Sequence, residues 1–321
     1  AGNMHGMYIV GENPALSEPD ISHAATALEQ LEFLVVQDIF ITETAEYADV
    51  ILPAATSPEK HGTFTNTERR IQRVRASASP PGRARQDWEI TSALARRLGH
   101  DWQYDHPSEI MDEIASLTPI YGGVSYERLE EGDQHGLQWP CWDAEHPGTP
   151  YLYDYDEGEF NFPDGKARFV PADGGHPGEI ADEAYPYTLT SGRVLYHWHT
   201  GQITRRVEGL MSHVGESFVE IHPETAEELS IADGEYVRVR SRRGAIVVRA
   251  TVTDRVGPAT LFIPMHFAAG AVNKLTQETY DPTSGIPEYK ITSVDVEPLG
   301  PDADPNELRT PDVGSGTAAD D

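Results

Sequence analysis

The stretch that decides the fold is Tyr187–Thr204, YTLTSGRVLYHWHTGQIT, in which an expected strand at Tyr187–Thr190 runs into a polar, glycine-containing loop. Downstream of it the chain reads as short, evenly spaced strands that are separated by turn pairs such as Asp233-Gly234. Further strands are expected at Phe218–Ile221, Glu235–Arg240, Ala245–Thr253, Ala259–Ile263 and near Ser293–Glu297, with one helix at Pro223–Leu229. This pattern predicts a six-stranded closed β-barrel over residues 185–299.

Upstream, residues 1–118 carry the pattern of a Rossmann-like, partial α/β domain. Apolar runs predict parallel strands at Met7–Val10, Phe33–Val36 and Ala48–Leu52, with a helix from Asp20 between the first two. Two more helices are expected, one from Asp87 and one at about Ser108–Ser116. Residues 119–184 are predicted to be a connector with a strand near Ala167–Val170, and residues 300–321 a disordered acidic tail. The predicted fold class is therefore α/β plus β.

The formal net charge of −29, from 53 acidic and 24 basic residues, is the strongest feature of the composition. It argues against binding to nucleic acid or anionic membranes, because such binding depends on basic patches. Concentrated salt screens the repulsion between acidic side chains. Because the acidic residues are spread along the whole chain, they favour a salt-adapted protein over a local acidic surface with a function. We expect a halophilic cytoplasm and no membrane span, because no apolar run reaches about 18 residues. The chain starts within a predicted domain, which leaves an export signal open.

Cys141 is the only cysteine of the chain. It can form no intrachain disulfide, and it cannot ligate an iron–sulfur cluster alone. Its place in LQWPCWD, between two tryptophans, predicts a small hydrophobic residue in a packed turn.

Two polar segments follow the first two predicted strands, Gly11-Glu12-Asn13 and Gln37-Asp38. In an open parallel sheet, ligands collect beyond the carboxyl ends of the strands, so both segments are candidates for binding. The alternative is that they are ordinary loop starts.

The loop after Thr190 gathers hydroxyls, a glycine, an arginine and two histidines. Hydroxyl and backbone N–H donors beside an arginine fork are what a diphosphate requires. His197 and His199 could instead face one way as metal ligands, but no spaced third ligand is nearby. Ser191 as a hydrolase nucleophile also stays open, without the expected glycine pattern around it. Two weaker clusters follow, at Pro264–Phe267 with Asn273, and at Ile286–Lys290.

Taken together and in order, these segments resemble molybdopterin oxidoreductases of the bis-guanine-dinucleotide class, and formate dehydrogenase catalytic (alpha) subunits in particular. The matching stretches, which span about residues 4–298, are MYIVGENPALSEPD, VVQDIFITETAEYADVILPA, GTFTNTERRIQRV, DWEI, LQWPC, SGRVLYHWHTGQITRR, VNKLT and PEYK. The resemblance implies a Rossmann-like domain that contacts one pterin guanine dinucleotide, and a barrel that closes over both.

The resemblance also implies which residues hold the cofactor. For the first dinucleotide they are Gly11, Glu12, Asn13, Gln37, Asp38 and Asp87. The carboxylate of Asp87 would recognise guanine by accepting hydrogen bonds from the paired N–H donors of the base. For the second they are Ser191, Gly192, Arg193, His197, His199, Thr200, Phe267, Asn273, Tyr289 and Lys290. No catalytic residue and no metal ligand is expected within this chain.

The family's four-cysteine segment for a 4Fe-4S cluster, and its cysteine or selenocysteine ligand to molybdenum or tungsten, have no counterpart here. We therefore expect a C-terminal portion, completed by a missing N-terminal half or a partner chain and served by electron-transfer subunits. The implied reaction is formate oxidation to carbon dioxide. A nitrate reductase of the same superfamily, a noncatalytic cofactor-binding module and an unrelated salt-adapted hydrolase are the alternatives.

Overall fold

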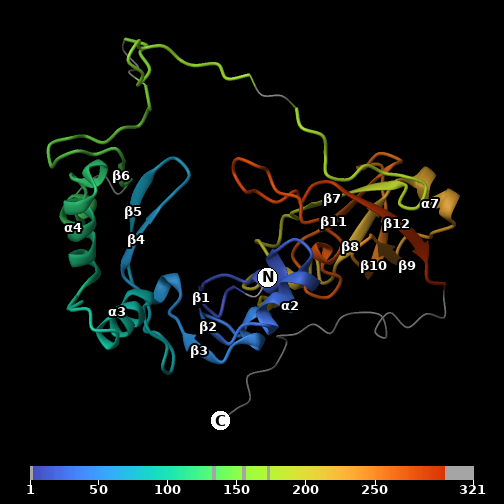
Figure 1. Cartoon of the computed structure of the whole chain (residues 1–321), viewed down its shortest axis with the longest axis horizontal. Helices are drawn as coiled ribbons and strands as arrows, with labels where there is room; N and C mark the ends of the chain where they lie inside the picture. The colour runs from blue at the N-terminus through green and yellow to red at the C-terminus, as the bar shows by residue number, and fades with distance from the viewer. Residues whose placement is uncertain (1–2, 132–134, 154–156, 172–173, 301–321) are drawn as a thin grey trace. The chain divides into compact units, whose positions relative to one another are not determined.

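The structure, a computed structural model, describes residues 3–131, 135–153, 157–171 and 174–300 (Figure 1). It divides into two units. The first comprises residues 1–51 and 175–321, and the second comprises residues 52–174. The predicted boundaries at 118/119 and 184/185 therefore do not coincide with these units, and the domain assignment stays a prediction. The predicted tail lies outside the described residues except for Gly300.

The first unit begins with a βαβ arrangement. Strand β1 (Gly6–Val10) pairs in parallel with β2 (Phe33–Asp38), with Gly6 opposite Phe33 and Val10 opposite Gln37. Between them lie α1 (Pro14–Ser17) and α2 (Ile21–Glu29), and after them η1 (Thr44–Tyr47) and β3 (Val50–Pro53), the third strand of the sheet. The core of this part consists of Ile9, Leu28, Leu34, Val36 and Ala45.

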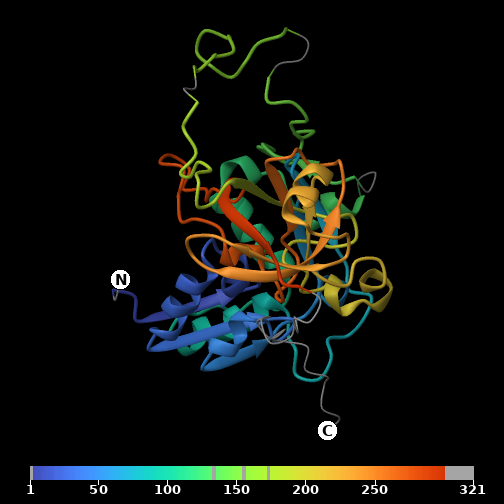
Figure 2. The same ribbon diagram turned by 90° about the vertical axis from the view of Figure 1, so that its right-hand side faces the viewer.

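The barrel of the first unit is closed, in the order β10-β8-β11-β7-β12-β9 (Figures 1 and 2). Its strands are β7 (Tyr187–Gly192), β8 (Phe218–Ile221), β9 (Tyr236–Arg240), β10 (Ala245–Val252), β11 (Thr260–Pro264) and β12 (Thr292–Pro298). Alternate side chains of each strand point inward and fill the interior, since Leu189, Ile221, Val239 and Ile263 are almost fully buried. The predicted six-stranded barrel is confirmed.

The barrel loops carry η4 (Thr204–Arg206), α6 (Glu208–Met211), α7 (Pro223–Leu229) and η5 (Val272–Lys274). The predicted helix at Pro223–Leu229 is confirmed, but the expectation of a single helix there is wrong because α6 also forms. One α-turn of four residues leaves too little periodicity to be recognised in a sequence.

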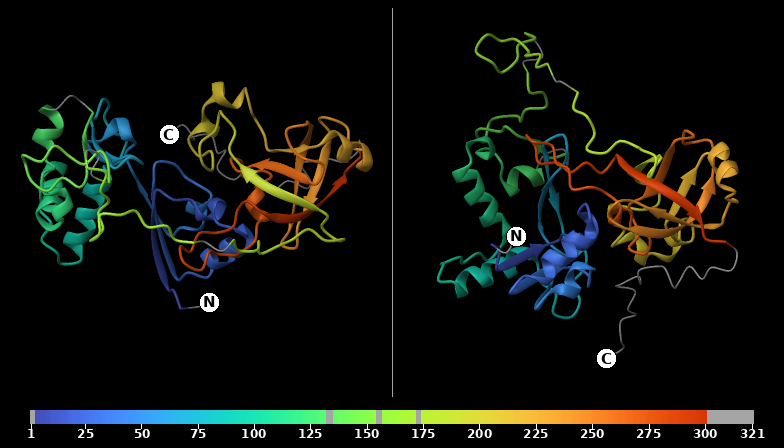
Figure 3. Two further views of the ribbon diagram at one scale, coloured as in Figure 1. Left: turned by 90° about the horizontal axis from the view of Figure 1, so that it is seen from above. Right: turned by 45° about the vertical axis from the view of Figure 1, so that its right-hand side comes forward.

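The second unit is built around a hairpin and three helices (Figure 3). Its elements are η2 (Ser57–Glu59), β4 (Gly62–Thr65), β5 (Arg70–Val74), α3 (Asp87–Arg97), α4 (Pro107–Leu117), η3 (Pro119–Tyr121), α5 (Tyr126–Glu131) and β6 (Leu137–Gln138). Cys141 is fully buried with Ile71, Met111, Val124 and Leu129, which confirms that it packs as a small hydrophobic residue.

Two local expectations in the second unit fail. The predicted strand near Ala167–Val170 is irregular, and Phe169 and Val170 are exposed, because their apolar side chains have no neighbouring strand to pair with. The hairpin β4–β5 was not expected, since its arginine-rich sequence hides the single buried position, Ile71. Within the described ranges, no helix has the length and apolar character needed to cross a membrane.

Candidate cofactor-binding site

A cavity of about 440 Å³ lies at the barrel end of the first unit. Its lining comes from the end of β7 and the following loop, from the end of β11, from η5, from the segment before β12 and from the end of α1. The lining residues are Ser17, Ser191, Arg193, His199, Thr200, Met265, Asn273, Tyr289 and Lys290. Seven of the residues that the sequence assigned to the second dinucleotide therefore meet in one cavity.

Reciprocal hydrogen bonds join the two main walls of this cavity. The Ser191 hydroxyl donates to the backbone carbonyl of Tyr289 at 2.8 Å, and the Lys290 ammonium donates to the backbone carbonyl of Ser191 at 2.5 Å. These contacts connect the loop after β7 with a segment almost a hundred residues further along the chain. The two predicted clusters thus form one site.

Two positively charged side chains that line this cavity have no carboxylate partner in the described structure and can bind an anionic ligand. Arg193 stacks its guanidinium over the ring of Trp198, 4.8 Å from the centroid, and Lys290 contacts only a backbone carbonyl. Neither forms a salt bridge with any carboxylate in the described part of the chain. Arg193 and Lys290 both line a cavity whose described lining includes no Asp or Glu. They provide the charge-assisted hydrogen bonds that a diphosphate accepts.

Asn273 offers a buried hydrogen-bond acceptor among the residues that line this cavity. Its Nδ2 donates to the backbone carbonyls of Leu16 at 3.1 Å and Ser17 at 2.9 Å, which fixes the orientation of the amide. Its Oδ1 is buried without a hydrogen-bond partner in the described structure. A buried oxygen of this kind is costly unless a donor reaches it. A ligand N–H or O–H group in the cavity would satisfy it.

Tyr289 completes the contact between the α/β part and the cavity. Its hydroxyl donates to the carbonyl of Ser17 at 3.0 Å. Burial, and then the charges of Glu18 and Tyr280, raise its pKa to about 12. The phenol is therefore neutral and remains a hydrogen-bond donor at every physiological pH.

His266 lies in the predicted cluster Pro264–Phe267 but was not assigned to the cofactor, although it shapes the cavity loop. This fully buried imidazole accepts a hydrogen bond at Nε2 from the Val194 amide at 2.9 Å, and its Nδ1 donates to the His199 carbonyl. The two backbone partners require the neutral ring with its proton on Nδ1. Burial is the main cause that holds its pKa below the ordinary value. It outweighs the hydrogen bond to the His199 carbonyl, which raises the pKa, and the neighbouring charges add to the lowering. A lone histidine ending an apolar strand was the available signal.

Three predicted residues support the cavity from beneath and do not line it. His197 is buried, with Nδ1 bonded to the Thr204 hydroxyl at 3.0 Å and Nε2 to the Val214 carbonyl at 2.7 Å. The ring of Phe267 packs edge-on against His197 at 5.0 Å. At Gly192, a Cβ would lie 2.5 Å from a ring carbon of Phe262. Both ring nitrogens of His197 therefore have hydrogen-bond partners within the fold.

The strand-end residues of the α/β part also lie together. Gly11 has φ +64°, and its amide donates to the carbonyl of Gln37 at 2.9 Å. Asn13 is buried and accepts from the Thr44 amide at 3.0 Å and the Thr44 hydroxyl at 2.7 Å. Asp38 accepts from the Ile39 amide at 2.6 Å. The two segments, 11–13 and 37–38, therefore share one sheet edge, as expected from parallel strands.

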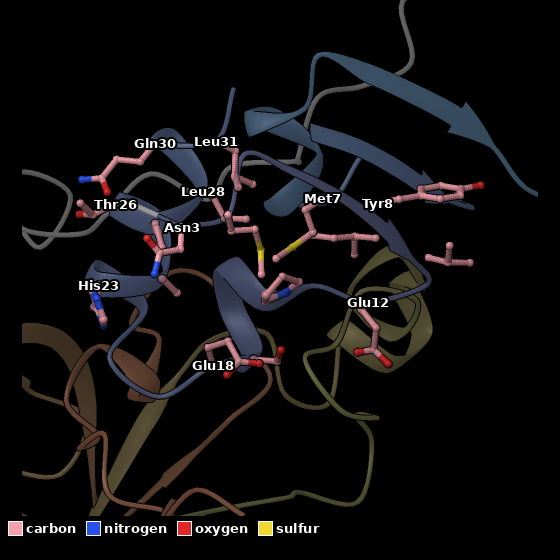
Figure 4. Close-up of a pocket in the computed structure, with 17 residues that line it drawn as sticks. Asn3, Met7, Tyr8, Glu12, Glu18, His23, Thr26, Leu28, Gln30 and Leu31 are labelled. Atoms are coloured by element: carbon pink, nitrogen blue, oxygen red, sulfur yellow. The ribbon is translucent and has the colours of Figure 1, made fainter. Parts of the chain in front are cut away.

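The remaining two predicted residues lie elsewhere. Glu12 is exposed and borders a hollow of about 1000 Å³ beside β1, to which Met7 and Tyr8 also contribute (Figure 4). Asp87 is the first residue of α3 in the second unit, where Lys60 donates to its carboxylate at 2.5 Å. Within the described ranges, no group of three or more His, Cys, Asp or Glu residues is placed to hold a metal ion.

The class of protein follows from comparison with known families. Residues 1–97 match the molybdopterin oxidoreductase family, and residues 187–293 match the molydopterin dinucleotide binding domain. The second match covers β7 to β11 and the first two residues of β12, together with most of the cavity. The chain belongs to the molybdopterin oxidoreductases and carries their dinucleotide-binding barrel.

Particular relatives are more specific. The chain is 45% identical over 295 residues to the F420-dependent formate dehydrogenase 1 subunit alpha of Methanococcus maripaludis, and 43% identical over 297 residues to the corresponding subunit of Methanocaldococcus jannaschii. These alignments cover 91% and 92% of the chain but only 43% of each relative, so the chain spans less than half of their length. A putative formate dehydrogenase of Bacillus subtilis is 44% identical, with 93% of the chain and 30% of that protein covered.

A solved structure shares the fold. Acetylene hydratase from Pelobacter acetylenicus superimposes with a TM-score of 0.72 over 91% of the chain and 44% of that protein, at 17% identity. At this identity the likeness concerns the fold alone.

Proposed function

We propose that this chain is the cofactor-binding portion of a molybdenum or tungsten oxidoreductase that oxidises formate to carbon dioxide. The observation that carries the proposal is the cavity lined by Arg193, Lys290 and Asn273. The two cations suit an anionic ligand, and the buried Asn273 Oδ1 suits a hydrogen-bond donor of that ligand. The choice of formate is supported by relatives that are named formate dehydrogenase alpha subunits and are about 45% identical.

The proposed ligand is a bis-molybdopterin guanine dinucleotide. Its metal centre supplies two-electron redox chemistry when bound. Ser191, Arg193 and Lys290 suit one diphosphate, and Asn273 can accept from a donor of the same ligand. This is the second dinucleotide of the sequence prediction, and the segments at Gly11–Asn13 and Gln37–Asp38, together with Asp87, are proposed for the first.

In this proposal the chain binds and orients. The cavity loop holds the diphosphate by hydrogen bonds, and the neutral Tyr289 and His266 keep backbone groups in place without adding charge. Burying a nucleotide tail in this cavity would hold the cofactor in one position and would exclude water from its phosphate contacts. The chain's contribution to rate is thus positional.

The proposed partners follow from the length of the relatives. The rest of the catalytic subunit, on the same polypeptide or on a partner chain, would supply the metal ligand and the 4Fe-4S cluster, because this chain has a single, buried cysteine. Electron-transfer subunits would accept the electrons. A cytoplasmic, salt-adapted setting is proposed from the net charge of −29.

A noncatalytic binding module is the second candidate, because the cavity residues Ser191, Arg193 and Lys290 suit the binding of a ligand by themselves. One experiment separates the two: native mass spectrometry and metal analysis of the protein purified from its own cells. A larger polypeptide or complex that carries molybdenum or tungsten with iron supports the oxidoreductase. A lone chain of 35.4 kDa with dinucleotide but no turnover of formate supports the module. A lone chain without either contradicts both.

A further inference from the structure

A chain of hydrogen bonds connects the two segments to which cofactor binding is assigned. Asn13, at the end of β1, donates from Nδ2 to Glu43 Oε2 at 2.6 Å. The other oxygen of Glu43 accepts from the Arg205 guanidinium at 2.7 Å, and Arg205 Nε donates to the Thr200 carbonyl at 3.3 Å. Asn13 belongs to the proposed site of one dinucleotide, and Thr200 lines the cavity of the other.

The centre of this chain is a largely buried ion pair. The side chain of Arg205 is 10% exposed and that of Glu43 is 13% exposed. Burying two charges is unfavourable unless the geometry and the remaining hydrogen bonds compensate. Both conditions hold here, because each oxygen of Glu43 has its own donor and Arg205 reaches a backbone carbonyl as well. Removing one partner would leave the other as a buried, uncompensated charge.

A second contact runs beside the first. Arg206 donates to the backbone carbonyl of Ile41 at 3.2 Å and lies over the ring of Phe40, 4.3 Å from the centroid. The amide of Phe40 in turn faces Asp38, the proposed ligand at the end of β2. Consecutive arginines of η4 therefore reach the loop that leaves the second strand end.

We infer that Glu43 and Arg205 are positioning residues that set the two dinucleotide-binding segments relative to each other. Neither lines the cavity, and neither was assigned to the site from the sequence. This inference rests on the proposed function for its meaning, since a fixed geometry between the segments matters only if both hold parts of one cofactor. The ion pair itself can be tested independently of any ligand.

The test is hydrogen–deuterium exchange on the protein as purified from its cells, with any partner chain retained. Glu43→Gln keeps the size of the side chain and removes its charge. Exchange is expected to rise about tenfold in peptides over residues 11–17 and 196–206, because a buried pair of this kind couples its neighbours by the equivalent of about one order of magnitude. Barrel strands β8–β10 are expected to stay unchanged. Arg205→Lys, which keeps the charge but loses the fork, should produce a smaller rise in the same two segments.

Glu46→Gln is the matched control, because Glu46 lies three residues away on η1 and is exposed. It should leave both segments unchanged. If Glu43→Gln accelerates exchange only within residues 42–47, or if Glu46→Gln has the same effect, the inference is wrong. Guanine nucleotide released from the same samples is measured in parallel. Wild-type protein without nucleotide would contradict the proposed function, while the exchange result would still decide whether Glu43 couples the segments.

Discussion

The ammonium of Lys290 donates a hydrogen bond to the backbone carbonyl of Ser191 at 2.5 Å. The hydroxyl of Ser191 donates in return to the carbonyl of the neighbouring Tyr289. Both contacts use backbone acceptors, so the positive charge of Lys290 is held in place without being neutralised. A pre-positioned cation costs a ligand less ordering entropy than a mobile surface lysine.

Lys290→Ala is therefore expected to weaken cofactor retention in the complete protein about ten- to a hundredfold, since hydrogen bonds to a charged group contribute about 1.5–3 kcal/mol. The measurement is molybdenum or tungsten and guanine nucleotide per protein after gel filtration. The control is Lys166→Ala, because Lys166 is exposed and outside the cavity. Equal metal content in both variants would count against the assignment of Lys290.

Arg193→Ala should lower retention by a similar factor, and Arg193→Lys should restore only part of it. The guanidinium stacks over Trp198 and can present two parallel N–H donors, whereas a lysine supplies a point charge without the planar stack. The same nucleotide and metal analysis measures the effect. Full retention by Arg193→Lys would show that charge alone, and not the fork, holds the ligand.

His266 predicts a pH dependence of stability. The buried imidazole has a lowered pKa, whereas the unfolded ring takes up a proton near its ordinary value of about 6.5. Below that pH the unfolded state binds more protons, so the stabilising contribution of the neutral ring is complete above about pH 6.5 and is lost as the pH falls further. His266→Phe should remove this part of the pH dependence and, by leaving Val194 N–H and His199 C=O without partners, cost about 1–3 kcal/mol at pH 8.

Urea unfolding between pH 5 and 8 measures both effects. His100→Phe serves as the control, because His100 is exposed and should change neither stability nor its pH dependence. If the stability of His266→Phe fell below about pH 6.5 as steeply as that of the wild type, other groups would cause the loss, and the role of His266 would be contradicted.

Asn273→Leu is expected to destabilise the first unit by about 2 kcal/mol, because the buried carbonyl of Leu16 loses its donor and the carbonyl of Ser17 keeps only the Tyr289 hydroxyl. Asn273→Asp should be worse, since a carboxylate would face the same two carbonyl oxygens. Denaturant unfolding followed by circular dichroism measures the loss. If Asn273→Asp proved as stable as the wild type, the hydrogen bonds to α1 could not be the reason for the burial of Asn273.

Local patterns were sufficient to predict most of the barrel and the α/β strands. The strand at Phe218–Ile221 and the helix at Pro223–Leu229 have the predicted bounds, because turn residues mark their ends clearly. The hairpin β4–β5 was missed for a physical reason. Only Ile71 of β5 is buried, so its sequence carries no alternation that a partly covered strand would show.

The sequence predicted residues that line the cavity. It did not predict residues that hold the lining residues or their loops in place. Ser191, Arg193 and Lys290 stand in motifs that match a family. Glu43, Arg205 and His266 take their roles from partners more than sixty residues away, and no local pattern announces such pairs. His197 shows the reverse case, since its motif suggested ligand binding but both ring nitrogens are occupied within the fold.

The acidic composition leads to the last prediction, that potassium chloride stabilises the chain. With 53 acidic and 24 basic residues, like charges repel in the folded state more than in the expanded one. Screening shortens the Debye length from about 10 Å at 0.1 M to about 3 Å at 1 M, so most of the gain should come below about 1 M. Thermal unfolding in increasing potassium chloride should show the midpoint rising over this range. The triple variant Glu227→Gln, Glu228→Gln and Asp254→Asn removes three exposed negative charges and should be more stable than the wild type at low salt, with a smaller gain on adding salt. A midpoint that is flat or falling with salt, or a variant with an unchanged salt response, would mean that charge repulsion does not limit the fold and that the acidic surface has another use.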